Sequence, residues 1–347
     1  MANGGKQISH FRQMLKELKE CGCLDGEELA LIREMYDGGA INTMWVKQNY
    51  SLENLDEDVE VVEEVQHVIY GPYHALYPVA HGASGTIYKA WEYGTDNIVA
   101  IKHLRPKKLS FYARERFLRE MDLLKSLSHT NILPILAGGE QDGEYFLVTP
   151  FMKGGSLEKR LRQLPAHRAM SDIAPLLAIV IQIGKALEFS HAQGIIHRDI
   201  KPSNILMDGD HPYLADFGLA RKIDQATDLT KGAVGTPCYM ASELWQKKVT
   251  PKSDIYSMAV MLYEIVTGEY PFPGTSAEQI LAKQLMSKPK PPISKDMALP
   301  QELNSFILRS LHSQPECRHP NITIFIHELI DILEDGLART CDHGNLI

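Results

Sequence analysis

The sequence predicts an α+β protein in which a strand-rich part is followed by a larger helix-rich part. Strand-like alternation of apolar and polar residues starts near Tyr73 and recurs in residues 98–101 and 145–148. From Ser156 onward the apolar spacing is mainly helical. Residues 150–155 contain two glycines and lie between the two patterns, which predicts a hinge there.

The first 70 residues predict a short helical segment that precedes these two parts. Apolar residues recur at helical spacing in residues 7–21, and a second helix begins at a capping Asp25 and ends at Gly38–Gly39. Residues 52–64 are acidic and predict a linker. Two short helices bury little surface alone, so we expect them to dock as a brace or inhibitor on the rest of the chain, on a partner, or on a second copy.

Charge is distributed unevenly along the chain. Residues 1–70 hold 6 Lys+Arg and 14 Asp+Glu, a net charge of −8, whereas the other 277 residues hold 36 − 6 = 30 basic and 44 − 14 = 30 acidic residues. An acidic head on a neutral body argues against non-specific nucleic-acid binding. The head is either a solvated surface or a docking segment.

Composition favours a soluble globular protein of the reducing cytoplasm, with 44% hydrophobic and 23% charged residues. The longest apolar run, residues 174–181, is far shorter than the roughly 18 residues of a membrane span, so we expect no membrane association. The first residues show no basic stretch followed by an apolar one, so we expect no signal peptide. The five cysteines are scattered, and Cys21 and Cys23 have no second Cys or His pair nearby, so we expect neither disulfides nor a zinc site.

Two stretches of the strand-rich part could contact phosphate. In VAHGASGTIYKA, residues 79–90, Gly82 and Gly85 flank two small residues, so backbone N–H groups could approach anionic oxygens, although such a stretch is more often a plain turn. Lys102 ends the strand predicted within NIVAIKHL. It indicates a functional site only if an acidic side chain pairs with it. Glu120, on a predicted amphipathic helix over residues 111–127, is the candidate that would hold Lys102 toward a phosphate.

The stretch IIHRDIKPSNILMDGDHPYLADFGLAR, residues 195–221, concentrates chemically useful side chains. Its apolar runs at 195–196, 205–207 and 213–215 predict short buried strands, with the charged residues in loops at their ends. There Asp199 could orient a hydroxyl and accept its proton, and Lys201 could neutralise transferring charge. An oxygen of Asn204 and the carboxylate of Asp216 suit the hard ion Mg²⁺. Each residue alone could equally form a loop ion pair or an Asx turn, and only their order indicates phosphate chemistry.

The motifs together resemble those of the eukaryotic-type (Hanks-type) serine/threonine protein kinases. They occur in the family's order over residues 73–333: the Gly-rich loop, VAIK ending at Lys102, Glu120 followed by HTNIL, HRDIKPSN, DFG, GTPCYMASE, KSDIYSMAVMLYEIVTGEYPF and CRHP. The resemblance implies a bilobal protein-kinase fold with a β-rich N-lobe (71–152) and an α-helical C-lobe (153–336). These form one kinase domain, 71–336, between an acidic helical extension, 1–70, and a tail, 337–347.

The resemblance also assigns roles to individual residues. Lys102, paired with Glu120, would bind the α- and β-phosphates of ATP. Asp199 would act on the substrate hydroxyl and Lys201 on the γ-phosphate, while Mg²⁺ would be held by Asn204 and Asp216. The structural positions of the motif would be His197, Arg198, Glu243, Asp254 and Arg318. The resemblance also implies which residues contact ATP, with Thr149 as the gatekeeper. These residues are Val79, Ala80, His81, Gly82, Ala83, Ser84, Gly85, Thr86, Ile87, Ala100, Lys102, Thr149, Pro150, Met152, Ser156 and Leu206.

Three positions depart from the family pattern. Ala80 replaces the first glycine of the Gly-rich loop, where only the tightness of the turn is affected. Pro150 lacks an N–H, but adenine needs only a carbonyl there and takes its N–H from Met152. Ser242 stands where the family has the proline of its APE motif. None of the three removes a charge or a metal ligand.

The resemblance predicts regulation by phosphorylation. In the family, kinases with an arginine before the catalytic aspartate, here Arg198, often need a phosphate on the activation segment, which the arginine pairs with. Thr230 is the first candidate and Thr227 the second, against the simpler possibility of solvated threonines.

Three functions remain open from the sequence. The first is a kinase that transfers the γ-phosphoryl group of ATP to Ser or Thr of protein substrates. The second is a pseudokinase that serves as a scaffold or nucleotide-regulated binding module. Pseudokinases usually lack the lysine or one of the two aspartates, whereas this sequence has Lys102, Asp199 and Asp216. The third is a small-molecule kinase, which Thr236 and Glu243 in GTPCYMASE argue against.

Overall fold

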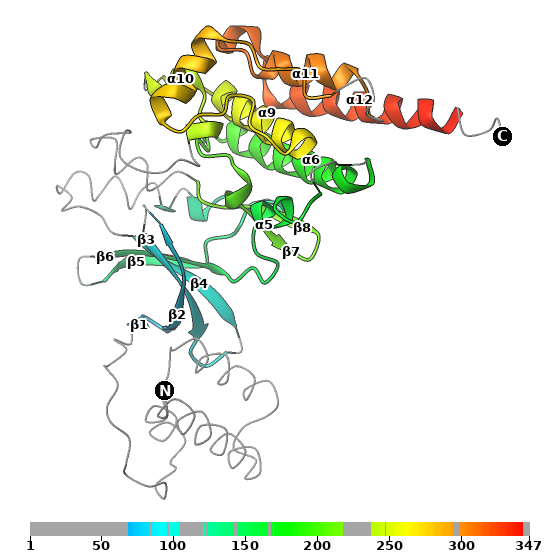
Figure 1. Cartoon of the computed structure of the whole chain (residues 1–347). Helices are drawn as coiled ribbons and strands as arrows, with labels where there is room; N and C mark the ends of the chain where they lie inside the picture. The colour runs from blue at the N-terminus through cyan, green and yellow to red at the C-terminus, as the bar shows by residue number, and fades with distance from the viewer. Residues whose placement is uncertain are drawn as a thin grey trace, which may run out of the picture. The chain divides into compact units, whose positions relative to one another are not determined.

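The computed structural model describes residues 69–82, 85–95, 97–104, 121–122, 124–141, 144–165, 168, 170–217, 237–246, 248–293 and 299–342. These residues form two compact units (Figure 1). The first unit contains the described residues up to 104 together with 136–151, and the second contains 121–135 and those from 152 onward. The predicted helical extension, most of the predicted helix over 111–127 and the end of the tail lie outside the described residues.

The first unit is built on one antiparallel sheet with the strand order β1-β2-β3-β4-β6-β5 (Figure 1). Its described strands are β1 (Ile69–Tyr70), β2 (Tyr73–Gly82), β3 (Gly85–Glu92), β4 (Ile98–Leu104), β5 (Ala137–Gln141) and β6 (Glu144–Pro150). β2 bulges between Ala75 and Tyr77 and between Pro78 and Ala80. Bulges redirect side chains and increase the local twist, so the end of β2 that leads into the Gly-rich turn bends away from a flat ladder.

Register assigns the residues of this sheet to two faces with different tasks. Directly opposed residues share a face, so Tyr88, Ile101 and Val148 lie on one side, where they join the buried cluster of this unit. On the other side Ala80 opposes Ile87, and Ile87 opposes Lys102. The strand alternation thus keeps this second set off the apolar core.

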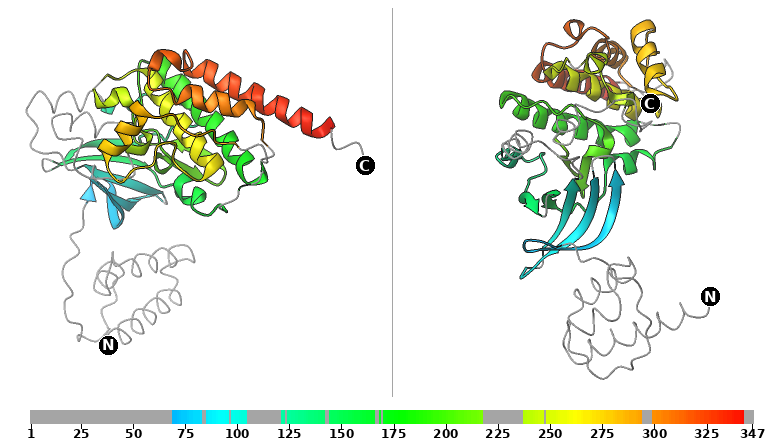
Figure 2. Two further views of the ribbon diagram at one scale, coloured as in Figure 1. Left: turned by 45° about the horizontal axis from the view of Figure 1, so that its top comes forward. Right: turned by 90° about the vertical axis from the view of Figure 1, so that its left-hand side faces the viewer.

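The second unit consists mainly of helices, with one small hairpin (Figure 2). Its longer helices are α6 (Met170–Ala192), α9 (Pro251–Thr267), α10 (Ala277–Met286), α11 (Glu302–Ser310) and α12 (Ile322–Asp342). Its short elements are α5 (Leu157–Leu161), η1 (Pro202–Asn204), β7 (Ile205–Asp208), β8 (His211–Leu214), η2 (Pro237–Tyr239), α8 (Ser242–Trp245) and η3 (Pro315–Cys317).

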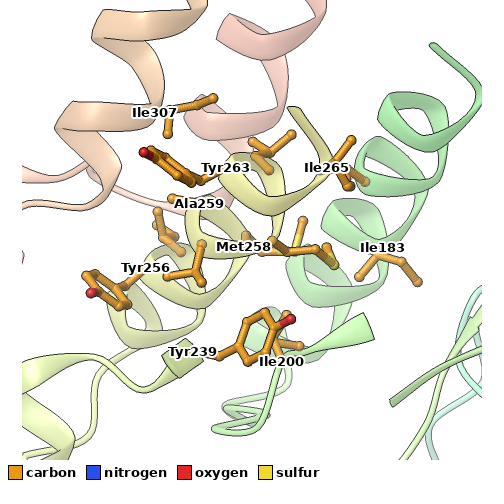
Figure 3. Packing of buried hydrophobic residues seen from close by; sticks show 14 of the residues in the cluster. Ile183, Ile200, Tyr239, Tyr256, Met258, Ala259, Tyr263, Ile265 and Ile307 are labelled. Atoms are coloured by element: carbon orange, nitrogen blue, oxygen red, sulfur yellow. The ribbon is translucent and has the colours of Figure 1, made fainter. Parts of the chain in front are cut away.

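Helix α9 is the centre of this unit. It begins at Pro251, directly after Thr250, whose N–H donates to the hydroxyl of Ser253 at 3.3 Å, and it ends at Gly268, whose φ of 76° favours glycine. The helix is buried nearly all round, as its apolar sequence predicts. It packs against α6 and α11, and Figure 3 shows Met258 facing Ile183 in this core. Because each buried aliphatic side chain stabilises the fold by about 1.5–3 kcal/mol, α9 is a rigid support for the polar side chains on its surface.

One local expectation differs from the structure. Residues 195–196 were expected to form a strand but lie in a loop, because Gly194 (φ 71°) ends α6 and the Ile195 N–H bonds to the carbonyl of Ser190. The runs at 205–207 and 213–215 do form β7 and β8, apart from Ala215. In addition, residues 121–135 group with the second unit, where Leu133 donates its N–H to the carbonyl of Leu214.

One helix of the described part, Ser171–Ala192 within α6, is long and apolar enough to meet the length and composition of a membrane span. The core helix of a soluble protein can have the same length and composition, and 56% of the apolar 18-residue stretch of this helix is buried inside the protein. The resemblance to a span is therefore weak evidence for one.

Candidate active site

Asp254 anchors the loop that follows α6. The carboxylate lies on α9 and has no exposed surface. Its Oδ2 accepts the N–H of His197 at 2.9 Å, and its Oδ1 accepts the N–H of Arg198 at 2.8 Å. The ring of His191 on α6 is 2.8 Å from Oδ2. Since hydrogen bonds to a charged acceptor are the stronger ones, a buried helix fixes the backbone of this loop.

Two residues of the site hold a left-handed backbone that non-glycine residues rarely adopt. Arg198 has a φ of 69° and Asp216 a φ of 61°. Each such residue costs on the order of 1–3 kcal/mol and persists only where its surroundings enforce it. At Arg198 the bond to Asp254 supplies that enforcement. Strain concentrated at two charged loop residues marks this part of the second unit as a functional site.

Asp199, Lys201 and Asn204 form a connected cluster in which Asn204 is buried and the other two are half-buried. The ammonium of Lys201 is 2.9 Å from Asp199 Oδ2. The amide of Asn204 donates to the same Oδ2 at 3.1 Å and to the Asp199 backbone carbonyl at 2.8 Å. The carboxylate of Asp199 is therefore oriented from two sides, and a hydroxyl brought to it would meet an acceptor in a fixed position.

His197 joins this cluster to Asp216. Its Nδ1 accepts the Asp199 N–H at 3.3 Å, so its Nε2 is assigned as the donor to the Ala215 carbonyl at 2.9 Å. Burial lowers the pKa of His197, outweighing the opposite effect of Asp254, and this favours the neutral ring that the two hydrogen bonds require. The Ala215 N–H in turn bonds to the carbonyl of Asn204 at 2.8 Å. Asp216, the next residue, is thus held beside the cluster.

Asn204 and Asp216 are suited to hold a hard cation. Because the amide nitrogen of Asn204 faces Asp199, its oxygen is the end that can coordinate, and Asp216 adds an exposed carboxylate. The described residues contain no group of three or more His, Cys, Asp or Glu that could hold a metal alone. An amide oxygen and one carboxylate fit Mg²⁺, which binds few protein ligands and shares the rest of its shell with substrate phosphates and water.

The residues predicted to contact the nucleotide in the second unit lie together. Gly154 donates to the carbonyl of Met207, and Met207 donates back to Gly155, so the hinge segment is paired with β7. A bridge joins Ser156 to Leu206, the residue before Met207. The hydroxyl of Ser156 also caps α5 by accepting the N–H of Lys159, a structural task that its sequence position did not suggest.

Several of the predicted nucleotide residues of the first unit lie on the non-core face of its sheet. Lys102 opposes Ile87, while Ala100 opposes Thr149. Gly85 has a φ of 144°, and a Cβ there would lie 1.8 Å from the carbonyl oxygen of His103, so only glycine fits. The other members are distributed around the Gly-rich turn and hinge: Val79 and Ala80 are exposed on β2, Thr86 is buried, Pro150 ends β6, and His81 and Gly82 are described by their backbone alone. Ala83, Ser84 and Glu120 lie outside the described residues, as do Thr227 and Thr230.

The predicted pair of Glu243 and Arg318 is buried and bidentate, with N–O distances of 2.7 and 2.8 Å. Burial alone raises the pKa of Glu243, but the hydrogen bonds and charge of Arg318 outweigh it and hold the pKa below its ordinary value. The departure at Ser242 is accommodated, because its hydroxyl donates to the carbonyl of Ser313 at 3.0 Å, a bond that proline could not make.

Sequence reasoning missed the side chains that hold residues 237–243 in place. Ser257 on α9 donates to the carbonyl of Tyr239 at 2.8 Å, and Gln284 on α10 donates to that of Met240 at 2.9 Å. The hydroxyl of Tyr239 bonds to Glu264, and burial raises the pKa of both groups. Ser257 and Gln284 are buried polar residues, but their partners are backbone groups far along the chain, which no local pattern reveals.

Comparisons with known proteins agree with this geometry. The protein kinase domain family matches residues 73–330. The chain is 34% identical over 282 residues to the serine/threonine-protein kinase PknD of Mycobacterium tuberculosis, which covers 78% of this chain and 41% of that protein. The chain thus spans about two fifths of the length of the curated relatives it matches.

Two solved structures resemble the fold. A point mutant of the PknI kinase domain of Mycobacterium tuberculosis has a TM-score of 0.59 at 23% identity, covering 78% of this chain and 99% of that one. Rad53 1–466 in complex with AMP-PNP has a TM-score of 0.59 at 26% identity, covering 73% of this chain and 63% of that one. With the family match over most of the chain and the strained, Asp254-anchored catalytic loop, the chain belongs to the protein kinase family.

Proposed function

We propose that this chain is a serine/threonine protein kinase that transfers the γ-phosphoryl group of ATP to hydroxyl groups of proteins. The observation that carries the proposal is the cluster in which Lys201 and Asn204 both hydrogen-bond the carboxylate of Asp199. Positioning of this kind is the main task of a phosphoryl-transfer enzyme, since the protein does little covalent chemistry itself. A lysine two residues after the catalytic aspartate, here Lys201 after Asp199, is the pattern of the serine/threonine kinases that this sequence resembles.

Each member of the cluster has a distinct task in this proposal. Asp199 accepts a hydrogen bond from the incoming hydroxyl, aligns its oxygen with the γ-phosphorus and takes its proton. Lys201 stabilises the negative charge that develops on the transferring group. Asn204 and Asp216 would hold Mg²⁺, which when bound neutralises charge on the phosphate oxygens. The anchoring of the loop by Asp254 keeps Asp199 in position through the cycle.

The nucleotide contacts are proposed from the two units separately. In the first unit, Lys102 would hold the α- and β-phosphates, and the aliphatic Ile87 and Ala100 would contact the adenine from the same sheet face. In the second unit, the aliphatic Leu206 would contact the adenine and Met152 would supply the backbone N–H. The Gly85 backbone, free of a side chain, allows phosphate oxygens to approach N–H groups.

Regulation by phosphorylation is part of the proposal. A phosphate on Thr230, or on Thr227, would pair with Arg198 and order the activation segment. Because Arg198 is held by its backbone at Asp254, a phosphate that pairs with its guanidinium would be tied to the same anchor as Asp199. The substitution Thr230→Ala is expected to lower the transfer rate at least about ten-fold, with Thr227→Ala as the comparison.

The test is transfer of label from γ-labelled ATP by the purified full chain. The chain is incubated with dephosphorylated casein and Mg²⁺, Mn²⁺ or Ca²⁺ in turn, and the labelled residues are identified by mass spectrometry. Label on Ser and Thr with Mg²⁺ supports the proposal. Nucleotide binding with no transfer under any of these ions would favour a pseudokinase scaffold instead, and label on Tyr alone would overturn the assigned acceptor.

A further inference from the structure

The carboxyl-terminal end of α10 carries an exposed patch that is both apolar and basic. Leu285 is 57% exposed and Met286 is 87% exposed, the highest value among the large exposed hydrophobic residues of the described part. Lys283, Lys288 and Lys290 are exposed beside them in the sequence. We call these five residues the α10 patch. Exposed apolar residues ringed by charge are typical of a docking surface.

The charge of the patch is not balanced by its own helix. Residues 279–295 contain four lysines and no acidic residue. The single carboxylate of α10, Glu278, lies in its first turn, where it hydrogen-bonds Ser276 and its own backbone. α10 packs against η2 and α8 through its other side, where the buried Gln284 donates to the carbonyl of Met240. The patch therefore points outward while the helix beneath it is fixed.

The acidic head of the chain has the complementary chemistry. Residues 52–65, LENLDEDVEVVEEV, hold seven acidic residues, six Leu or Val residues and no basic one. These residues lie outside those the structure describes. The two surfaces carry opposite charges, and both also carry apolar side chains. Such a combination fits an interface in which charge attraction speeds association and apolar contacts stabilise the complex.

We infer that residues 52–65 of one copy of this chain dock on the α10 patch of a second copy. The segment ends only four residues before β1 of the first unit, whereas the patch belongs to the second unit. When the segment comes from a second copy, the short stretch between the segment and β1 does not have to span the distance to the patch of its own chain. The contact is heterologous, since the two copies use different surfaces. It goes beyond the proposed kinase activity and does not depend on it.

The test is zero-length cross-linking of the full chain with a carbodiimide, which joins a lysine amine to a carboxylate in contact. A one-to-one mixture of ¹⁴N- and ¹⁵N-labelled chains distinguishes links within a chain from links between copies. We expect mixed-isotope links between residues 53–64 and Lys283, Lys288 or Lys290. The exposed Lys159 and Lys185 of the same unit serve as internal controls and should yield about five-fold fewer such links.

Variants separate the charged and apolar parts of the contact. Lys288→Glu with Lys290→Glu should lower the yield about five-fold, and adding Asp56→Lys with Glu57→Lys should restore it with amine and carboxylate exchanged. Met286→Ser should also lower the yield about five-fold with no change of charge. Ile324→Ser, a change at the 43% exposed Ile324 of α12, is the matched control and should have no effect.

Three results would overturn the inference. One is an equal yield for the patch and control lysines. Another is a full yield in Met286→Ser, which would leave only non-specific attraction of charges. The third is links confined to single-isotope pairs, which would place the segment on its own chain.

Discussion

Replacing Arg318 by methionine tests the packing of the second unit most severely. The change keeps much of the side-chain volume but removes the guanidinium that holds Glu243. Glu243 is 7% exposed and retains the hydroxyl of Ser253 at 2.8 Å. Removing one partner of a buried ion pair costs about 3–5 kcal/mol. We therefore expect the free energy of unfolding of this unit to fall by about that amount at pH 7.

The cost should depend on pH with a definite sign. In the wild type Arg318 depresses the pKa of Glu243, so the stability from the pair is present above the unfolded pKa and is lost as pH falls through the folded value. In Arg318→Met burial acts without that opposition and raises the pKa of Glu243 above its unfolded value. Protonation then removes the buried charge, so the loss of stability should be smaller at pH 5 than at pH 7.

The assay is urea denaturation followed by far-UV circular dichroism at 222 nm, a signal dominated by the helices of the second unit. Arg309→Met is the matched control, because Arg309 pairs with Glu328 at an exposed site where side-chain exposures are 42% and 36%. Its expected cost is at most about 1 kcal/mol. A cost for Arg318→Met as small as that of the control, or an equal cost at both pH values, would refute the reasoning.

Three further predictions concern the site and its surroundings. In Gly154→Ala the added Cβ would lie 2.5 Å from the carbonyl oxygen of Met207, so the paired backbone must shift at a cost of about 1–3 kcal/mol; an unchanged denaturation midpoint would contradict this. Ser242→Ala removes the bond to the carbonyl of Ser313 and should cost about 1 kcal/mol in the same assay, whereas a neutral result would mean that the bond contributes nothing. Asp254→Asn weakens the anchor of the catalytic loop and should lower turnover about 100-fold with an unchanged circular dichroism spectrum; near-normal turnover would show that the anchor is dispensable.

The sequence predicted the elements whose patterns are local or whose motifs are strongly ordered. The mainly helical apolar spacing from Ser156 onward predicted helices, and the buried α9 is one of them. The run at 205–207 predicted β7. The pair of Glu243 and Arg318, 75 residues apart, was expected only because the motif order resembles a known family. Short-range periodicity and family resemblance thus covered different parts of the fold.

The parts that the sequence did not predict depend on tertiary partners. β5 has the sequence AGGEQ, whose two glycines give no strand signal, and its pairing with β6 alone makes it a strand. The bonds from Ser257 and Gln284 to backbone carbonyls likewise require helices that meet only in the folded unit. Residues 195–196 are an apolar pair that predicts a strand, but they lie in a loop because Gly194 ends the preceding helix.

The measurement that tests the central claim most directly is the rate of γ-phosphoryl transfer to a serine or threonine peptide by the full chain and by Asp199→Asn at saturating ATP and Mg²⁺. Because the substitution keeps the shape of the cluster but removes the charge that orients the hydroxyl and accepts its proton, the rate should fall at least about 100-fold while ATP affinity stays within about two-fold. A variant that transfers phosphate at close to the wild-type rate would contradict the assignment of Asp199 as the catalytic residue, and with it the proposed mechanism.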